Sequence, residues 1–290
     1  MNARPLSFYL FAAFFALYVL FLYGPMIAIF VLSFQGPSGG LTFPMNGVSL
    51  HWFAKLAEGN GIVDLGSAFR RSLSLGLVVM VLTVVLSVAA GLSFRKKFKG
   101  SSILFYTAVA SLIVPSIVTS LGIALEFRLV DDTVRDSLAD WWETGMGLFT
   151  SGLGAHLTWT LPFGLLIMFA VFNRFDSRLE EAARDLGASH WQTFWHVVLP
   201  IILPSVIGIG LFGFTLSWDE LARSSQAIGP VNTLPLELQG LTTTVTNPDI
   251  YALGTLISCV SFLVIALCLG LVLWLQKRRN RLGSDAGKGV

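Results

Sequence analysis

Charged residues are scarce in this sequence. Only 12% of its 290 residues are Asp, Glu, Lys or Arg, whereas 54% are hydrophobic, and an average soluble domain is about one-quarter charged. This composition predicts an integral membrane protein. The formal net charge of +2 is too small to indicate a nucleic-acid partner.

Cysteine is also scarce, and the motifs of common catalytic sites are missing. Both cysteines, Cys259 and Cys268, lie in one apolar run, which excludes a disulfide framework or a CxxC metal site and favours packing roles. The nearest approach to a phosphate-binding Walker A loop, GSDAGKG at 283–289, has the wrong spacing. The sequence also lacks an HExxH zinc pair, and the serine of TSGLG is not in GxSxG order and has no acid and histidine arranged near it. We therefore expect no enzyme, and an intramembrane hydrolase is a weaker alternative.

Long apolar runs dominate the rest of the chain. A membrane-spanning helix needs about 20 mostly apolar residues, and the alternation expected of barrel strands is missing. The sequence thus predicts an all-α membrane protein with a single transmembrane domain over 1–290. Six spans are expected, at about 8–34, 72–94, 101–127, 150–172, 201–222 and 250–275. The first is longer than the apolar core of a signal peptide, about 7–15 residues, so we expect it to be retained.

Basic residues are unevenly distributed between these runs. If the N-terminus is cytoplasmic, the cytoplasmic segments hold 13 of the 19 Lys and Arg residues, which is the bias of the positive-inside rule. They are Arg4, Arg95, Lys96, Lys97, Lys99, Arg174, Arg178, Arg184, Lys277, Arg278, Arg279, Arg281 and Lys288. The pair Arg70 and Arg71 opposes the bias. We expect an N-in and C-in topology, with the loop 173–200 in the cytoplasm.

The loop 173–200 is a polar stretch in an otherwise apolar chain. Its first half, RLEEAARDL, is rich in good helix formers. Gly187 is expected to end this helix, Ser189 to cap a second short helix, and Pro200 to mark the start of the next span. The loop either merely joins two spans or binds a partner. Its small alanines allow close approach and its glutamates can pair with a partner's arginine, which favours the second function.

A specific spacing occurs within this loop. Its residues are Glu181, Ala182, Ala183, Gly187, Val197, Leu199 and Pro200. They resemble the EAA signature of ABC importer permeases, EAA-x3-G-x9-I-x-L-P, with valine in place of isoleucine. The likeness extends over most of the chain and is closest to the spermidine/putrescine permease branch, through LEEAARDLGAS, LFGFTLSWDE, GPVNTLPLEL and NPDIYALGTL.

The resemblance implies a type I ABC importer permease fold (MetI-like) in the bacterial inner membrane. In this family the loop is a coupling helix that seats on a cytoplasmic ATPase. The chain would bind no cofactor itself, because ATP and Mg²⁺ would be held by two ATPase subunits. A second permease chain would complete the path, as a heterodimer if the polyamine likeness holds, and a periplasmic binding protein would deliver the substrate.

The resemblance also assigns roles to the residues of the signature. Glu181 would be the charge contact with the ATPase, and Ala182 and Ala183 the close-packing surface. Gly187 would form the turn. Leu199 and Pro200 end the signature, and the proline would set the angle at which force enters the fifth span.

Carboxylates near span ends are candidates for a substrate path, because charges within spans are costly. Asp219 and Glu220, with Trp218 beside them, would attract a cation by charge and by cation–π contact. Glu126, near the outer end of the third span, is a further candidate. Each carboxylate has a structural alternative, which is pairing with a nearby arginine along a helix.

The resemblance favours a polyamine-like cation as the substrate. However, the chain has LSWDE where polyamine permeases tend to have LSLDD or LSFDD. This leaves an opine or another small solute as an alternative. A gradient-driven secondary transporter or channel is the alternative from another functional class.

Overall fold

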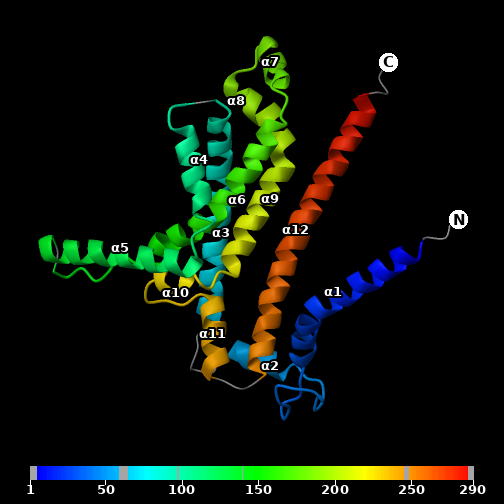
Figure 1. The fold of residues 1–290 in the computed structure, drawn as a ribbon, viewed down its shortest axis with the longest axis vertical. Helices are drawn as coiled ribbons and strands as arrows, with labels where there is room; N and C mark the ends of the chain where they lie inside the picture. The colour runs from blue at the N-terminus through cyan, green and yellow to red at the C-terminus, as the bar shows by residue number, and fades with distance from the viewer. Residues whose placement is uncertain (1–4, 59–64, 97, 139, 245–247, 287–290) are drawn as a thin grey trace. The chain divides into compact units, whose positions relative to one another are not determined.

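The chain is helical throughout the part that the computed structural model describes, namely residues 5–58, 65–96, 98–138, 140–244 and 248–286. Those residues contain no strand beyond one isolated bridge, which confirms the expected all-α class. The helices in Figure 1 are α1 (Leu6–Leu32), α2 (His51–Glu58), α3 (Leu65–Phe94), α4 (Ser101–Ala110), α5 (Ser116–Ser137), α6 (Leu153–Asn173), α7 (Arg178–Asp185), α8 (His190–Thr193), α9 (Leu199–Trp218), α10 (Ser224–Ala227), α11 (Leu234–Thr244) and α12 (Asp249–Ala286). Two π-helical turns, η1 (Leu148–Gly152) and η2 (Phe194–Val198), precede α6 and α9.

Among the described residues, five helical segments are long and apolar enough to cross a membrane. They are Leu6–Leu32, Leu65–Phe94, Leu148–Asn173, His190–Trp218 and Asp249–Leu275. These segments correspond to five of the six expected spans. The chain also divides into two compact units, one made of 1–66 with 237–260 and the other of 67–236 with 261–290.

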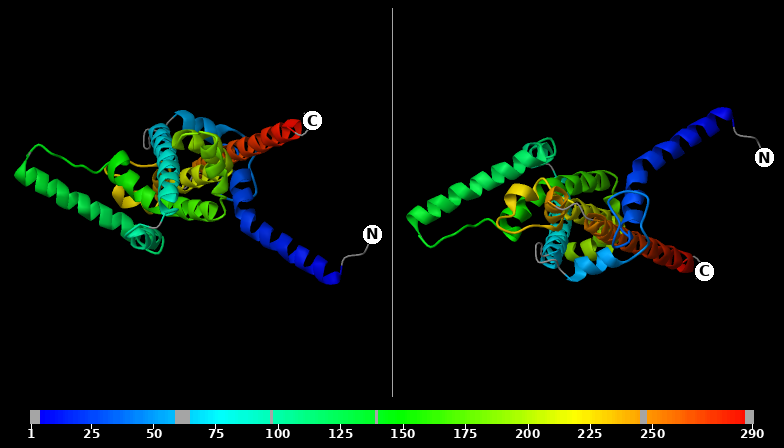
Figure 2. Two further views of the ribbon diagram at one scale, coloured as in Figure 1. Left: turned by 90° about the horizontal axis from the view of Figure 1, so that it is seen from above. Right: turned by 90° about the horizontal axis from the view of Figure 1, so that it is seen from below.

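The expected third span at 101–127 is corrected by the structure, because it is not one continuous helix. α4 ends at Ala110, and α5 begins at Ser116 directly after Pro115. Proline lacks the N–H that a helix needs and disfavours helical geometry in the preceding residue. α5 then runs across the direction of α6 and α9 (Figures 1 and 2). Because the residues before Pro115 are apolar, a count of hydrophobic residues does not detect this break.

Before this break, the chain runs antiparallel along α6. The Phe105 ring in α4 lies 5.1 Å, centroid to centroid, from that of Phe169 near the end of α6. The hydroxyl of Ser111 donates a hydrogen bond of 2.8 Å to the carbonyl oxygen of Thr158, near the beginning of α6. α4 and the turn after it therefore extend along much of the length of α6.

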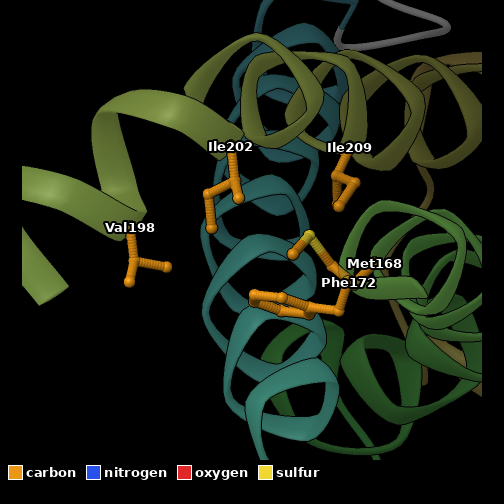
Figure 3. Packing of buried hydrophobic residues seen from close by; sticks show 5 residues of the cluster. All are labelled: Met168, Phe172, Val198, Ile202 and Ile209. Carbon is orange, nitrogen blue, oxygen red and sulfur yellow. The ribbon is translucent and has the colours of Figure 1, made fainter. Parts of the chain in front are cut away.

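The core of the larger unit lies between α3, α6 and α9. Close packing depends on small residues: a Cβ added at Gly213 would lie 3.2 Å from the Met80 Cα. Across α3 and α6, the hydroxyls of Thr83 and Thr160 share a buried hydrogen bond of 2.8 Å. Figure 3 shows side chains of α6, η2 and α9 in a cluster made of Met168, Phe172, Val198, Ile202 and Ile209.

In the smaller unit, polar contacts tie α2 and the loop before it to the start of α12. The Lys55 Nζ lies 3.0 Å from the Asp249 Oδ2. The Tyr251 hydroxyl donates to the carbonyl oxygen of Leu41 at 2.7 Å.

Candidate functional site

The loop 173–200 folds into α7 and α8 joined by a tight turn at Gly187, the order of elements that the sequence predicts. Gly187 has φ of +88°, a left-handed conformation that glycine adopts without steric cost. Its N–H donates to the carbonyl oxygen of Arg184 at 2.8 Å, and the Ala188 N–H donates to that of Ala183 at 3.0 Å. These two bonds form the Schellman cap that ends α7.

The second helix is fixed at its start by a capping box. The Ser189 Oγ accepts the Gln192 N–H at 3.3 Å, and the Gln192 Oε1 accepts the Ser189 N–H at 2.8 Å. Each residue thereby satisfies a backbone donor of the other. The direction of α8 is thus set locally, immediately after the glycine turn.

α8 does not end before the next span, in contrast to the expected separate short helix. His190–Trp218 is one continuous helical segment of 29 residues, in which Leu199 and Pro200 follow the π-helical turn η2. A proline within an α-helix removes one hydrogen bond and clashes with a carbonyl one turn earlier. The wider π-helical turn accommodates both effects, so Pro200 does not break the helix. α8 and α9 are therefore continuous, whereas α7 is separated from them by the turn at Gly187.

The two glutamates of α7 have different surroundings. The Glu180 Oε1 lies 2.6 Å from the Arg95 Nη1, and the Arg95 guanidinium is 5.1 Å from the centroid of the Phe172 ring. Glu181 is exposed and forms no ion pair within the described residues. Ala182 is exposed as well. The outward face of α7 thus presents a carboxylate beside a small side chain.

At the other end of α9, the structure places Trp218 in the core. Its side chain is 1% exposed, stacked on Phe214 at 5.7 Å and in edge contact with Phe69 at 5.6 Å between ring centroids. It does not present an open aromatic face next to Asp219. Trp218 therefore anchors the end of α9 against α3.

Glu220 is engaged by Arg223, which is the structural alternative that the sequence leaves open. The Glu220 Oε1 accepts the Arg223 N–H at 2.9 Å, and its Oε2 lies 3.6 Å from the Arg223 Nη1. Arg223 is fully buried. Its Nη1 donates to the Ser116 Oγ at 2.6 Å, its Nε donates to the Thr158 Oγ1 at 3.2 Å, and its guanidinium lies 4.5 Å from the centroid of the Trp159 ring.

A buried histidine completes this polar cluster, and sequence reasoning does not identify it. The His156 Nδ1 lies 2.8 Å from the Ser217 Oγ, and its Nε2 lies 3.0 Å from the Ser224 Oγ. The hydroxyl of Ser224 in turn donates to the carbonyl oxygen of Glu220 at 2.7 Å. Because the partners are distant in sequence, only the fold brings them together.

Asp219 is the one carboxylate of the LSWDE segment whose side chain is exposed and, among the described residues, has no hydrogen bond or ion pair. Desolvation nevertheless raises the pKa of its carboxyl group. Glu126 is also exposed, in α5, and within the described chain no ion pair joins it to Arg128. Of the two carboxylates of LSWDE, Asp219 is therefore the more accessible, because Glu220 is paired with Arg223.

Comparison with protein families identifies a match over residues 83–281. The matching family is described as "Binding-protein-dependent transport system inner membrane component". The putrescine transport system permease protein PotI of Escherichia coli (strain K12) is 30% identical over 240 residues, which cover 82% of this chain and 81% of that protein. The spermidine/putrescine transport system permease protein PotC of Haemophilus influenzae is 30% identical over 263 residues, covering 90% and 95%.

Solved structures show the same fold at low sequence identity. A chain of a bacterial ABC transporter involved in the import of the acidic polysaccharide alginate superposes with a TM-score of 0.63 at 15% identity, covering 95% of each chain. A chain of the MetNI methionine ABC transporter in an inward-facing conformation gives a TM-score of 0.54 at 15% identity, covering 79% of this chain and 99% of that one.

Proposed function

This chain belongs to the family of binding-protein-dependent transport system inner membrane components, and from that premise we propose that it carries a polyamine-like cation across the bacterial inner membrane, sharing the path with a second permease chain. It is a permease subunit of an ABC importer and not the ATPase. ATP and Mg²⁺ would be bound by two partner ATPase subunits, and a periplasmic binding protein would deliver the solute. The substrate class is supported by two relatives whose names specify putrescine or spermidine.

The proposed topology has six crossings with both termini in the cytoplasm. The Arg95–Glu180 ion pair brings the basic turn after α3 and the loop 173–200 to the same membrane face. Since α6 crosses once between them, α4 with its following turn must supply a second crossing. One crossing each by α1, α3, α9 and α12 would complete six, and the positive-inside rule applied to the basic turns favours both termini on the cytoplasmic side.

The loop 173–200 is proposed to transmit motion of the ATPase to the solute path. Glu181 and Ala182 form the outward contact face. Since His190–Trp218 is one helix, a displacement of the loop moves the end of α9 and Asp219, about 43 Å away at a rise of 1.5 Å per residue. The exposed, unpaired carboxylate of Asp219 at this end is the observation that carries the proposal of a cationic solute.

Replacing Glu181 with alanine is expected to weaken binding of the ATPase subunit by about 2 kcal/mol or more, because one member of a desolvated charge pair is removed. The measurement is the amount of ATPase that co-purifies with this chain in mild detergent. Asp185→Ala is the matched control, since Asp185 is an exposed carboxylate of the same helix outside the signature. Undiminished ATPase with Glu181→Ala, or equal losses in both variants, would contradict the assigned contact.

Replacing Asp219 with asparagine is expected to reduce the affinity for a diamine about tenfold. Two unit charges about 4 Å apart attract by roughly 1–4 kcal/mol between bulk water and a protein surface. The measurement is ATP-dependent uptake of labelled putrescine into vesicles that contain the complete transporter. Glu143→Gln is the control, because Glu143 is an exposed carboxylate expected on the same outer side.

Two outcomes of this uptake experiment would count against the proposal. Equal uptake by Asp219→Asn and the unaltered transporter would remove Asp219 from the path, and Glu126→Gln then tests the remaining candidate. Uptake that persists without ATP while an ion gradient is present would indicate a gradient-driven transporter instead.

A further inference from the structure

A cleft of about 920 Å³ lies between α3 and the helices of the loop 173–200 in the larger unit. One wall is a continuous apolar face of α3, made of Val84, Val85, Val88, Ala89 and Leu92. At the end of this wall, the rim carries Arg95, Lys96 and Arg184. We propose that the cleft binds one phospholipid with an anionic head group, with its phosphate at the basic rim and an acyl chain along α3.

The charge at the rim matches an anionic head group. The three cations face a single carboxylate, that of Glu180, so the rim has a net charge of two positive. Glu180 is engaged with Arg95, and neither Lys96 nor Arg184 has a carboxylate partner within the described residues. Both side chains are exposed. The Nε of Arg184 donates to the carbonyl oxygen of Glu180 at 3.2 Å, which leaves its two terminal nitrogens and the Lys96 ammonium for a phosphate group.

The length of the apolar wall matches an acyl chain in one leaflet. From Val84 to Arg95 the helix rises about 16 Å at 1.5 Å per residue, and half of a hydrocarbon core of about 30 Å is about 15 Å. The spacing of the wall residues places them on one helix face. A free phosphate ion would need only the rim and would leave this wall without a function.

Two indoles in the same cleft favour a lipid over a helix of another chain. Trp191 and Trp195 line it and are 68% and 46% exposed. Tryptophan concentrates at the level of lipid head groups, which is where the basic rim would lie. The proposed lipid thus contacts both α3 and the coupling loop. This inference rests on the position of the loop at the membrane face and not on the identity of the solute.

The test is native mass spectrometry of the delipidated transporter complex after addition of phosphatidylglycerol or phosphatidylcholine. One phosphatidylglycerol is expected to remain bound per copy of this chain. The double variant Lys96→Gln with Arg184→Gln should weaken this binding about fivefold for each charge removed. Arg178→Gln with Lys99→Gln is the matched control, because it removes two exposed charges from the same helix and the same turn outside the cleft. This control should retain the lipid.

A second variant tests the acyl-chain wall separately from the charges. Ala89 is exposed, so Ala89→Trp fills the cleft without disturbing the core, and bound phosphatidylglycerol should be lost. The proposal is overturned if the Lys96/Arg184 variant keeps the lipid or the control pair loses it equally. If Ala89→Trp retains phosphatidylglycerol, only the head group is bound, at the basic rim, and the acyl-chain wall has no role. If Ala89→Cys forms a disulfide with a cysteine of the second permease chain, the cleft is an interface between the two chains and not a lipid site.

Discussion

Replacing Gly187 with valine is expected to reduce ATP-driven uptake by this transporter about 5- to 30-fold, the equivalent of about 1–2 kcal/mol, while the chain still inserts into the membrane. The left-handed backbone at Gly187 costs an L-residue about 1–2 kcal/mol, and a β-branched residue is a genuine outlier there. Relief of this strain breaks the two hydrogen bonds that end α7 and reorients it relative to the capped α8. The measurements are uptake and ATP hydrolysis by the same reconstituted transporter.

Gly100 provides a matched control for this prediction. It also has φ of +88°, and a Cβ added at either glycine meets no atom within 4 Å. Gly100→Val therefore introduces the same local strain in the turn between α3 and α4, outside the contact face of the loop. Similar loss of uptake in both variants, or normal coupling in Gly187→Val, would show that the turn at Gly187 does not transmit force.

The features that sequence analysis predicts best are those that depend on neighbouring residues. The turn of the coupling loop follows from a glycine after a strong helix former and from Ser189 three residues before Gln192. Each cap is complete within a few residues, so the sequence alone contains all of its partners. The five long apolar helices are predicted for the same reason.

The features that the sequence does not reveal depend on contacts between distant segments or on backbone chemistry. A count of apolar residues passes over Pro115 and predicts a single span where the chain turns. LSWDE suggests three adjacent residues around a cation, but Trp218 packs against Phe69 of α3 and Glu220 is held by Arg223. Periodicity records side-chain spacing along one helix and contains no information about neighbours from other helices.

Arg223 is the residue whose removal is expected to destabilise the larger unit most. Arg223→Met should lower the free energy of unfolding by about 3–5 kcal/mol, because breaking a buried ion pair leaves the other charge uncompensated. It also removes the hydrogen bonds to Ser116 and Thr158, which tie the segment between α9 and α10 to α5 and α6. The measurement is thermal unfolding of the purified transporter in detergent. Arg178→Met is the control, since Arg178 is an exposed residue of α7 that forms no ion pair within the described part of the chain, and exposed charges of this kind contribute less than about 1 kcal/mol.

A second substitution separates the electrostatic contribution of Arg223 to stability from its contribution through packing. If the loss of stability comes mainly from the uncompensated carboxylate of Glu220, the double variant Arg223→Met with Glu220→Gln should be more stable than Arg223→Met alone. A double-mutant cycle measures this difference as a coupling free energy. Arg223→Lys should recover little, because a lysine cannot reproduce the forked contacts of a guanidinium. If the effects of Arg223→Met and Glu220→Gln on stability are instead additive, Arg223 stabilises the fold through Ser116, Thr158 and the Trp159 ring. Glu220 would then be free to contact the solute together with Asp219.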